Sequence, residues 1–302
     1  MTKRFWIVML LVGLSLAVAL PSAAKPGAEP GSGPESDPTL LWNTFLGGSA
    51  WDDGYAVAVD GNRNVYVAGT SDGTWGSPIR AYGGAGDAFV AKLNSKGQLV
   101  WNTFLGSATG EDQAYAIALD GSGNVNVTGD SLFTWGKPIH AHSGQSQDVF
   151  VAQLGSNGAL RWNTFHGGQS IDRGYGLATD GSGNIYVSGE SHGAWGSPVV
   201  PPSTGLINEE AFVARLSRDG ALQWNTFMGD ANGADNASAV AVNGSVAVAG
   251  RSMRSWGSPV RPHSGDFYGD AFVAQLNSQT GVRQWNTFLG GAATDVGLGI
   301  AC

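Results

Sequence analysis

Trp101-Asn102-Thr103-Phe104 is a motif that this chain of 302 residues repeats. The same four residues begin at Trp42, Trp162, Trp224 and Trp285, so successive copies start 59, 61, 62 and 61 residues apart. A fixed period indicates a repeat architecture, in which each unit buries its apolar faces only against its neighbours. We therefore expect one domain made of units of about 60 residues.

Each unit has the pattern of two β-hairpins. In the first complete copy, residues 55–59 and 65–69 flank a turn that contains Gly61, and residues 88–93 and 98–105 flank a turn that contains Gly97. Short β-rich runs around Gly-containing turns predict antiparallel strand pairs. Four antiparallel strands per unit, repeated along the chain, are typical of propeller blades. The predicted fold class is an all-β propeller of four-stranded antiparallel blades.

Side-chain size predicts the order of the strands in a blade. The first strand is rich in Ala, which suits the crowded position nearest the axis, and the fourth carries the Trp and Phe of the motif. Because blades diverge with distance from the axis, large aromatic side chains are needed to fill the space at their outer ends. We therefore expect Trp101, Trp162, Trp224 and Trp285 to be core residues.

Four complete blades account for most of the chain, and a partial fifth remains. An outer strand is expected at Leu40 to Leu46 and an inner strand at Gly297 to Cys302. Three arrangements fit: a fragment of a longer protein, a ring whose last blade is built from both termini, or an open arc completed by another molecule. We favour an incomplete or truncated propeller, which is expected to self-associate through open strand edges.

Three phrases of the repeat carry a family resemblance. They are Asp-Gly-Ser-Gly-Asn-Ile-Tyr-Val-Ser-Gly (Asp180 to Gly189), Asp-Ala-Phe-Val-Ala-Lys-Leu (Asp87 to Leu93) and Trp-Asn-Thr-Phe-Leu-Gly-Gly (Trp285 to Gly291). They resemble the bacterial SBBP repeats, named for seven-bladed β-propellers. The resemblance implies an exported or surface propeller without an established common activity, so it assigns no functional residue.

The N-terminus has the features of a secretory signal. Basic Lys3 and Arg4 precede an apolar run from Phe5 to Leu20, and small residues follow up to Ala24. An uncleaved membrane anchor is the alternative, but the run is shorter than the roughly 20 residues that span a bilayer. We expect a signal peptide at 1–24, a flexible linker at 25–39 and the propeller at 40–302, in a periplasmic, secreted or cell-surface protein.

Charge and cysteine content exclude some partners. Removing Lys3 and Arg4 with the signal leaves 14 basic and 24 acidic residues, a net charge of −10. Nucleic acid and anionic membranes are bound by basic patches, so neither is expected as a partner, and no membrane insertion is expected after cleavage. The single cysteine, Cys302, excludes an internal disulfide.

The long connections between strands all lie at one end of the predicted blades, which we call the top face; the short hairpin turns lie at the bottom face. Binding residues usually lie on loops held by a rigid scaffold, so the top face is where we expect a binding site. An aspartate recurs eight positions before each Asp-Gly or Asn-Gly turn, at Asp52, Asp112, Asp172 and Asp235. A second acidic residue opens the third strand, at Asp87, Asp148, Glu210 and Asp270. Such carboxylates suit Ca²⁺, the one cofactor considered, although repetition in every blade favours a loop-capping role.

Aromatic and histidine residues of the top loops are the other candidates. The phrase Trp-Gly-x-Pro recurs at Trp75, Trp135, Trp195 and Trp256, where an indole would stack on a sugar ring or would pack between adjacent loops. His140 and His142, with His166 as a third ligand, would suit a transition metal. These histidines differ between blades and match no metal-binding spacing, so no metal site is predicted.

No catalytic motif is present in the sequence. There is no nucleophile elbow, phosphate-binding loop or zinc-protease motif. The first hypothesis is an exported, non-enzymatic propeller that binds protein or carbohydrate through its top-face loops or displays them at the surface. The alternative is a polysaccharide-active enzyme of the glycosidase or lyase type that uses two top-face carboxylates.

Overall fold

The computed structural model describes residues 40–144, 146–203, 209–265 and 268–302. The signal peptide and linker predicted at 1–24 and 25–39 lie outside the described residues. The chain divides into one unit that ends at Leu41 and a second from Trp42 to Cys302. In the described ranges, no helix has the length and hydropathy needed to cross a bilayer.

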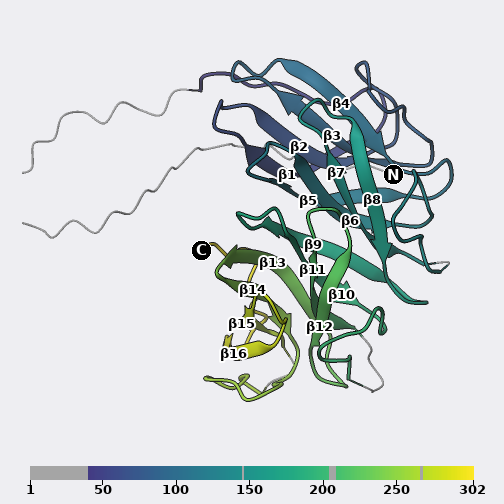
Figure 1. Ribbon diagram of the computed structural model, residues 1–302. Helices are drawn as coiled ribbons and strands as arrows, with labels where there is room; N and C mark the ends of the chain where they lie inside the picture. Colours follow the sequence, from purple (N-terminus) through teal and green to yellow (C-terminus); the bar gives the residue numbers. More distant parts are fainter. Residues whose placement is uncertain (1–39, 145, 204–208, 266–267) are drawn as a thin grey trace, which may run out of the picture. The chain divides into compact units, whose positions relative to one another are not determined.

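The described part of the second unit contains four antiparallel sheets of four strands, each in chain order (Figure 1). The first sheet comprises β1 (Asp52–Val59), β2 (Val65–Ser71), β3 (Asp87–Leu93) and β4 (Leu99–Leu105). The second comprises β5 (Asp112–Leu119), β6 (Val125–Ser131), β7 (Asp148–Leu154) and β8 (Leu160–His166). The third comprises β9 (Asp172–Thr179), β10 (Ile185–Ser191), β11 (Glu210–Leu216) and β12 (Leu222–Met228). The fourth comprises β13 (Asp235–Asn243), β14 (Ser245–Ser252), β15 (Asp270–Asn277) and β16 (Arg283–Leu289). The predicted all-β propeller with four-stranded blades is confirmed.

Each residue type of the repeated motif has its own structural task. The indole of Trp101 crosses to the next sheet, where its Nε1 donates to the Ser156 carbonyl at 3.2 Å. The amide of Asn102 donates to the Trp75 carbonyl at 2.8 Å and so anchors the long loop of its own sheet. Phe104 is fully buried and packs edge-on against that Trp75 ring, with centroids 5.9 Å apart. The motif therefore joins adjacent sheets and fixes the top loops at the same time.

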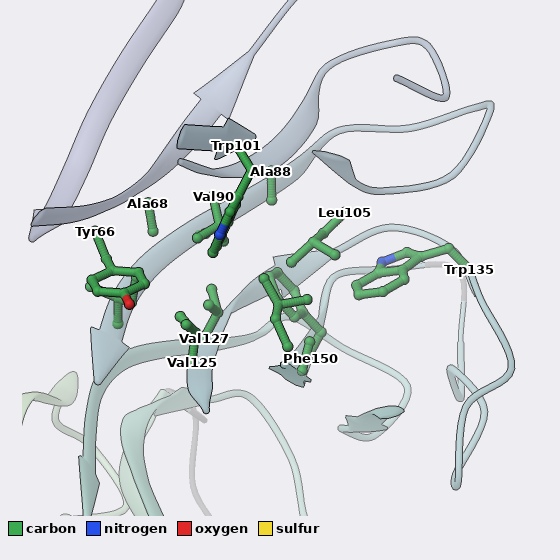
Figure 2. Packing of buried hydrophobic residues seen from close by; sticks show 14 of the residues in the cluster. Tyr66, Ala68, Ala88, Val90, Trp101, Leu105, Val125, Val127, Trp135 and Phe150 are labelled. Carbon is green, nitrogen blue, oxygen red and sulfur yellow. The ribbon is translucent and has the colours of Figure 1, made fainter. Parts of the chain in front are cut away.

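The first strands of successive sheets pack against one another in chain order, β1 on β5, β5 on β9 and β9 on β13. Small side chains permit this approach: a Cβ built on Gly176 would lie 2.9 Å from the Ala239 Cα. Farther out, larger side chains fill the space between sheets, as Figure 2 shows where Tyr66 and Trp101 of the first sheet approach Val127 of the second. Each such buried apolar side chain contributes about 1.5–3 kcal/mol.

The ends of the repeat array differ from the prediction. Residues 40–46 and 297–302 form no strand, because neither segment has a partner strand among the described residues. Trp42 still makes the contact of the motif, donating from Nε1 to the Ser95 carbonyl at 3.1 Å. Trp285, predicted as core, is 38 % exposed, because none of the described residues covers it with a further turn. The two segments of the predicted partial fifth blade thus form no strand in the described ranges, although the Gly297 N–H donates to the Gly250 carbonyl of β14 at 3.1 Å.

The strand registers confirm the predicted top and bottom faces. Asp52 pairs with Ser71, and Ser71 pairs with Asp87, so the first residue of β1 and of β3 lie at one end of the sheet. Val59 pairs with Val65 at the other end, beside the short hairpin turn. The other three sheets repeat this arrangement.

Candidate functional site

The four repeated aspartates begin the inner strands at the top face. Asp112 and Asp172 are fully buried, and each accepts a hydrogen bond from a serine hydroxyl, that of Ser131 or Ser191, and one from a backbone N–H of the preceding link. Asp52 accepts from Ser71 Oγ at 2.5 Å in the same way. Burial raises the pKa of Asp112, Asp172 and Asp235 to about 7. These contacts give the carboxylates a loop-capping role, and a ligand role for them stays a prediction.

The acidic residues that open the third strands lie beside these caps. Asp87 is fully buried and accepts from the Gly83 N–H at 2.6 Å. A Cβ built on Gly106 would lie 2.5 Å from Asp87 Oδ1 and 2.7 Å from Asp112 Oδ2, so the two carboxylates meet at this glycine. Burial raises the pKa of Asp87 to about 6. In the described ranges, no three His, Cys, Asp or Glu side chains are grouped closely enough to hold a metal ion.

The four loop tryptophans are buried, with exposed fractions of 4 to 7 %: Trp75, Trp135, Trp195 and Trp256. Each ring packs edge-on against two phenylalanines of its own sheet, with centroids 5.2–5.9 Å apart. Their ring faces are therefore covered, which supports packing over sugar stacking.

Two of the three histidines considered as metal ligands, His140 and His166, lie close together, and in the described ranges they belong to no group of three metal-ligating side chains. The rings of His140 and His166 stack with centroids 5.8 Å apart, and His166 stacks on Trp195 at 5.6 Å. Burial lowers the pKa of His166 to about 4, so this ring is neutral at pH 7. The stack lines a cavity of about 300 Å³ between the second and third sheets. His142 lies apart from it, 3.8 Å from Asp148.

A set of residues on the first and second strands of three sheets forms a second candidate site, which we call the inner-strand cluster: Tyr55, Tyr115, Asp130, Arg173, Tyr175 and Glu190. The three tyrosines come from β1, β5 and β9, and their rings follow one another with centroids 5.6 and 5.5 Å apart. Arg173 donates from Nη1 to Glu190 Oε1 at 2.9 Å, and its Nε lies 3.4 Å from Asp130 Oδ2. One guanidinium therefore links carboxylates from two sheets.

The electrostatics of this cluster are unusual for a surface. Asp130 is 4 % exposed, and burial raises its pKa to about 6 against the opposing effect of the Arg173 charge. Burial, then the Asp130 carboxylate, raises the pKa of Tyr115, so this hydroxyl stays protonated. Asp130 Oδ1 is buried and has no hydrogen-bond partner in the part of the chain that the structure describes. The Tyr55 ring, by contrast, is 45 % exposed and accessible to a ligand.

Sequence reasoning did not identify this cluster, although a signal for it exists. The strand position occupied by Asp130 and Glu190 holds Thr70 in the first sheet and Arg251 in the fourth. A residue type that changes from sheet to sheet, while the strands around it repeat, is not needed to form the fold. Comparing the repeats with one another therefore marks this position as one that is open to function.

The sequence matches the SBBP family, a beta-propeller repeat, over residues 42–74 and 149–194. The first match extends from Trp42 through β1 and β2, and the second covers most of β7 through β10. No curated protein matches the sequence. The matches fall on the repeated strands and loops, so they identify the architecture and assign no ligand.

Proposed function

Because the chain is built from SBBP β-propeller repeats, we propose that it is an exported, non-enzymatic propeller that serves as a binding or surface-display scaffold. The contact surface is the top face around the inner-strand cluster, and the partner is a protein or a carbohydrate. The observation that carries the proposal is the Arg173 link between Asp130 and Glu190 beside an exposed tyrosine ring, at positions that differ from sheet to sheet.

This surface has the composition of a recognition site. Tyrosine supplies a large ring and a hydroxyl at low entropic cost, and arginine supplies directional donors. Tyr55 presents its ring, and Arg173 leaves 30 % of its side chain exposed. The carboxylates behind Arg173 hold its guanidinium in place, so the site is organised before a partner arrives.

A glycan array and a pull-down with the secreted protein test the proposal. Tyr55→Ala is expected to lose the captured partner, because it removes an exposed ring without opening the core. Val100→Ala is the matched control: Val100 is 53 % exposed and lies on β4, away from the cluster, so this variant keeps binding. Blank arrays and pull-downs beside measurable turnover of a polysaccharide would exclude the scaffold role.

The enzyme alternative has one observation in its favour. Asp130 and Glu190 share the Arg173 guanidinium, and glycosidases use two carboxylates within about 10 Å. Both carboxylates are buried, at 4 and 6 % exposed, which weighs against contact with a polymer. If the alternative holds, Glu190→Gln abolishes polysaccharide turnover and Asp52→Asn leaves it unchanged.

Export and self-association are proposed from the sequence and are tested directly. Mass spectrometry of the exported protein is expected to find a chain that begins at Lys25, and a chain that retains Met1 contradicts cleavage. Light scattering tests association, for which the exposed Val57, Val59 and Trp285 supply apolar surface on the first and fourth sheets. A monomer at all concentrations contradicts association.

A further inference from the structure

The bottom face carries a polar cavity between the second and third sheets. Its volume is about 510 Å³, within the roughly 300–1,000 Å³ of small-molecule sites. Its walls come from the hairpin turns and the outer strand, and its polar groups are Asp120, Gln153, Arg161, Trp162, Arg218 and Asp219. It lies at the opposite end of the strands from the inner-strand cluster.

Comparison with the other sheets shows why the cavity lies here. In the first sheet Tyr66 packs edge-on against Trp101 with centroids 6.1 Å apart, and in the third Tyr186 packs against Trp224 at 6.2 Å. The second sheet has Asn126 at this position, and its side chain is half the size of tyrosine. The space that a phenol ring fills in two sheets is thus left beside Trp162.

Polar groups around this space lack the partners that their counterparts have. Trp101 and Trp224 each donate from Nε1 to a serine carbonyl of the next turn at 3.2 Å, whereas Trp162 Nε1 is buried without a partner among the described residues. Asn126 accepts from Gln153 Nε2 at 3.0 Å, but its own Nδ2 finds no acceptor in the described part of the chain. Both N–H groups lie behind the cavity surface, so the packing of this turn differs from that of its counterparts in the first and third sheets.

Charge at the mouth of the cavity is balanced. Arg161 and Arg218 line the cavity together with Asp120 and Asp219, and Arg161 Nη1 donates to Asn124 Oδ1 at 2.6 Å. A lining with two positive and two negative side chains binds neither a strong anion nor a strong cation preferentially. They suit a neutral ligand with many hydroxyl groups, each of which both donates and accepts.

We propose that this cavity is a binding site for a neutral mono- or disaccharide. The sugar oxygens accept from the two arginines, and its hydroxyls donate to Asp120 and Asp219. The indole of Trp162, which lines the cavity, supplies the apolar contact that a sugar ring needs. The competing occupants are water, which would fill the cavity without selectivity, and a phenol, which would fill only the space that a tyrosine ring takes in the first and third sheets.

Nuclear magnetic resonance of the exported protein tests the proposal with glucose, N-acetylglucosamine, cellobiose, lactose and maltose as probes. The readout is the indole N–H signal of Trp162, assigned by its absence in Trp162→Phe. At least one sugar is expected to shift this signal and to saturate. No shift with any of the five sugars overturns the proposal, as does a shift caused by p-cresol but by none of the sugars.

Two variants and two controls locate the effect. Asn126→Tyr introduces the tyrosine that the first and third sheets have at this position. Its ring fills the space beside Trp162 as Tyr66 and Tyr186 do in their sheets, so the affinity for the sugar is expected to fall by about tenfold or more. Asp219→Asn removes an exposed acceptor and also weakens it. Lys96→Ala, at the equivalent turn position of the first sheet, and Tyr55→Ala, at the top face, leave it unchanged. Unaltered affinity in Asn126→Tyr refutes the site, and loss of partner binding in Tyr55→Ala reports on the proposed function alone.

Discussion

Replacing Trp224 and Trp285 by alanine, one at a time, tests the contact that joins adjacent sheets. The two residues hold the same place in the motif, on β12 and β16. Trp224 is 6 % exposed, lies against the Cα of Gly281 in the next turn and donates to the Ser278 carbonyl. Trp285 is 38 % exposed and donates within its own sheet, to Gln275 Oε1 at 2.6 Å. Trp224 is covered by a turn of the following sheet, whereas Trp285 has no such cover among the described residues.

The expected costs follow from this difference. Trp224→Ala opens a cavity between two sheets and removes the hydrogen bond to Ser278, which corresponds to about 3–5 kcal/mol. Trp285→Ala removes a ring that is already partly hydrated and that contacts no further sheet among the described residues. The expected loss of unfolding free energy is therefore about 1 kcal/mol. For a domain of this size each kcal/mol lowers the melting temperature by about 2–4 °C. The melting temperature is therefore expected to drop by on the order of 10 °C in Trp224→Ala and by about 3 °C in Trp285→Ala.

Differential scanning calorimetry and urea unfolding of both variants measure the two costs. The midpoint of urea unfolding is compared at constant slope, because a changed slope would indicate loss of two-state behaviour. Trp224→Phe is a further control that keeps most of the ring and loses the N–H donor. Equal destabilisation by the two alanine variants would refute the argument that the Trp indoles join one sheet to the next.

Three further predictions concern the top face. Gly106→Ala places a methyl group against Asp87 and Asp112 and costs about 1–3 kcal/mol of unfolding free energy, whereas Gly121→Ala, with nothing within 4 Å of its Cβ, is neutral in the same urea assay. The free energy of unfolding rises as pH falls from about 7, because Asp112, Asp172 and Asp235 have native-state pKa values of about 7 and therefore bind protons in the native state before they do so in the unfolded state, each adding a slope of at most about 1.4 kcal/mol per pH unit. His166, whose pKa is lowered, acts in the opposite sense as a single group, and an Asp112→Asn variant with an unchanged pH profile of unfolding contradicts the prediction. Asn163→Ala removes the donor to the Trp135 carbonyl at 2.8 Å and accelerates proteolytic cleavage of the loop between β6 and β7, while an unaltered cleavage rate counts against the anchoring role.

The repeat made the fold predictable from sequence. Copies of the motif and of the Gly-containing turns give the number, order and direction of the strands, because strand pairing within a blade involves neighbours in the chain. The exposure of Trp285 was not predictable from its motif, since it depends on a neighbouring sheet rather than on local sequence. For the same reason the segments 40–46 and 297–302 have the sequence of strands and no strand pairing.

The candidate sites were less predictable, because repetition drew attention to structural residues. Asp112 and Trp135 recur in every copy since every loop needs a cap and a buried ring, and the structure buries both. Asp130 and Asn126 interrupt the repeat, and neither matches a motif. Their environment depends on Arg173 and Trp162, which lie far along the chain and come close only in the folded protein.

Three departures from the repeat lie at the junction of the second and third sheets. The Arg173 link between Asp130 and Glu190 lies at its top, the stack of His166 on Trp195 lies on its outer side, and the polar cavity beside Trp162 lies at its bottom. A junction that served only to pack would be selected for the same residues as its neighbours, where Tyr66 and Tyr186 fill the corresponding space. Because the repeated contacts on either side supply stability, side chains at this junction are freer to vary, and it is here that we propose the chain binds its ligands.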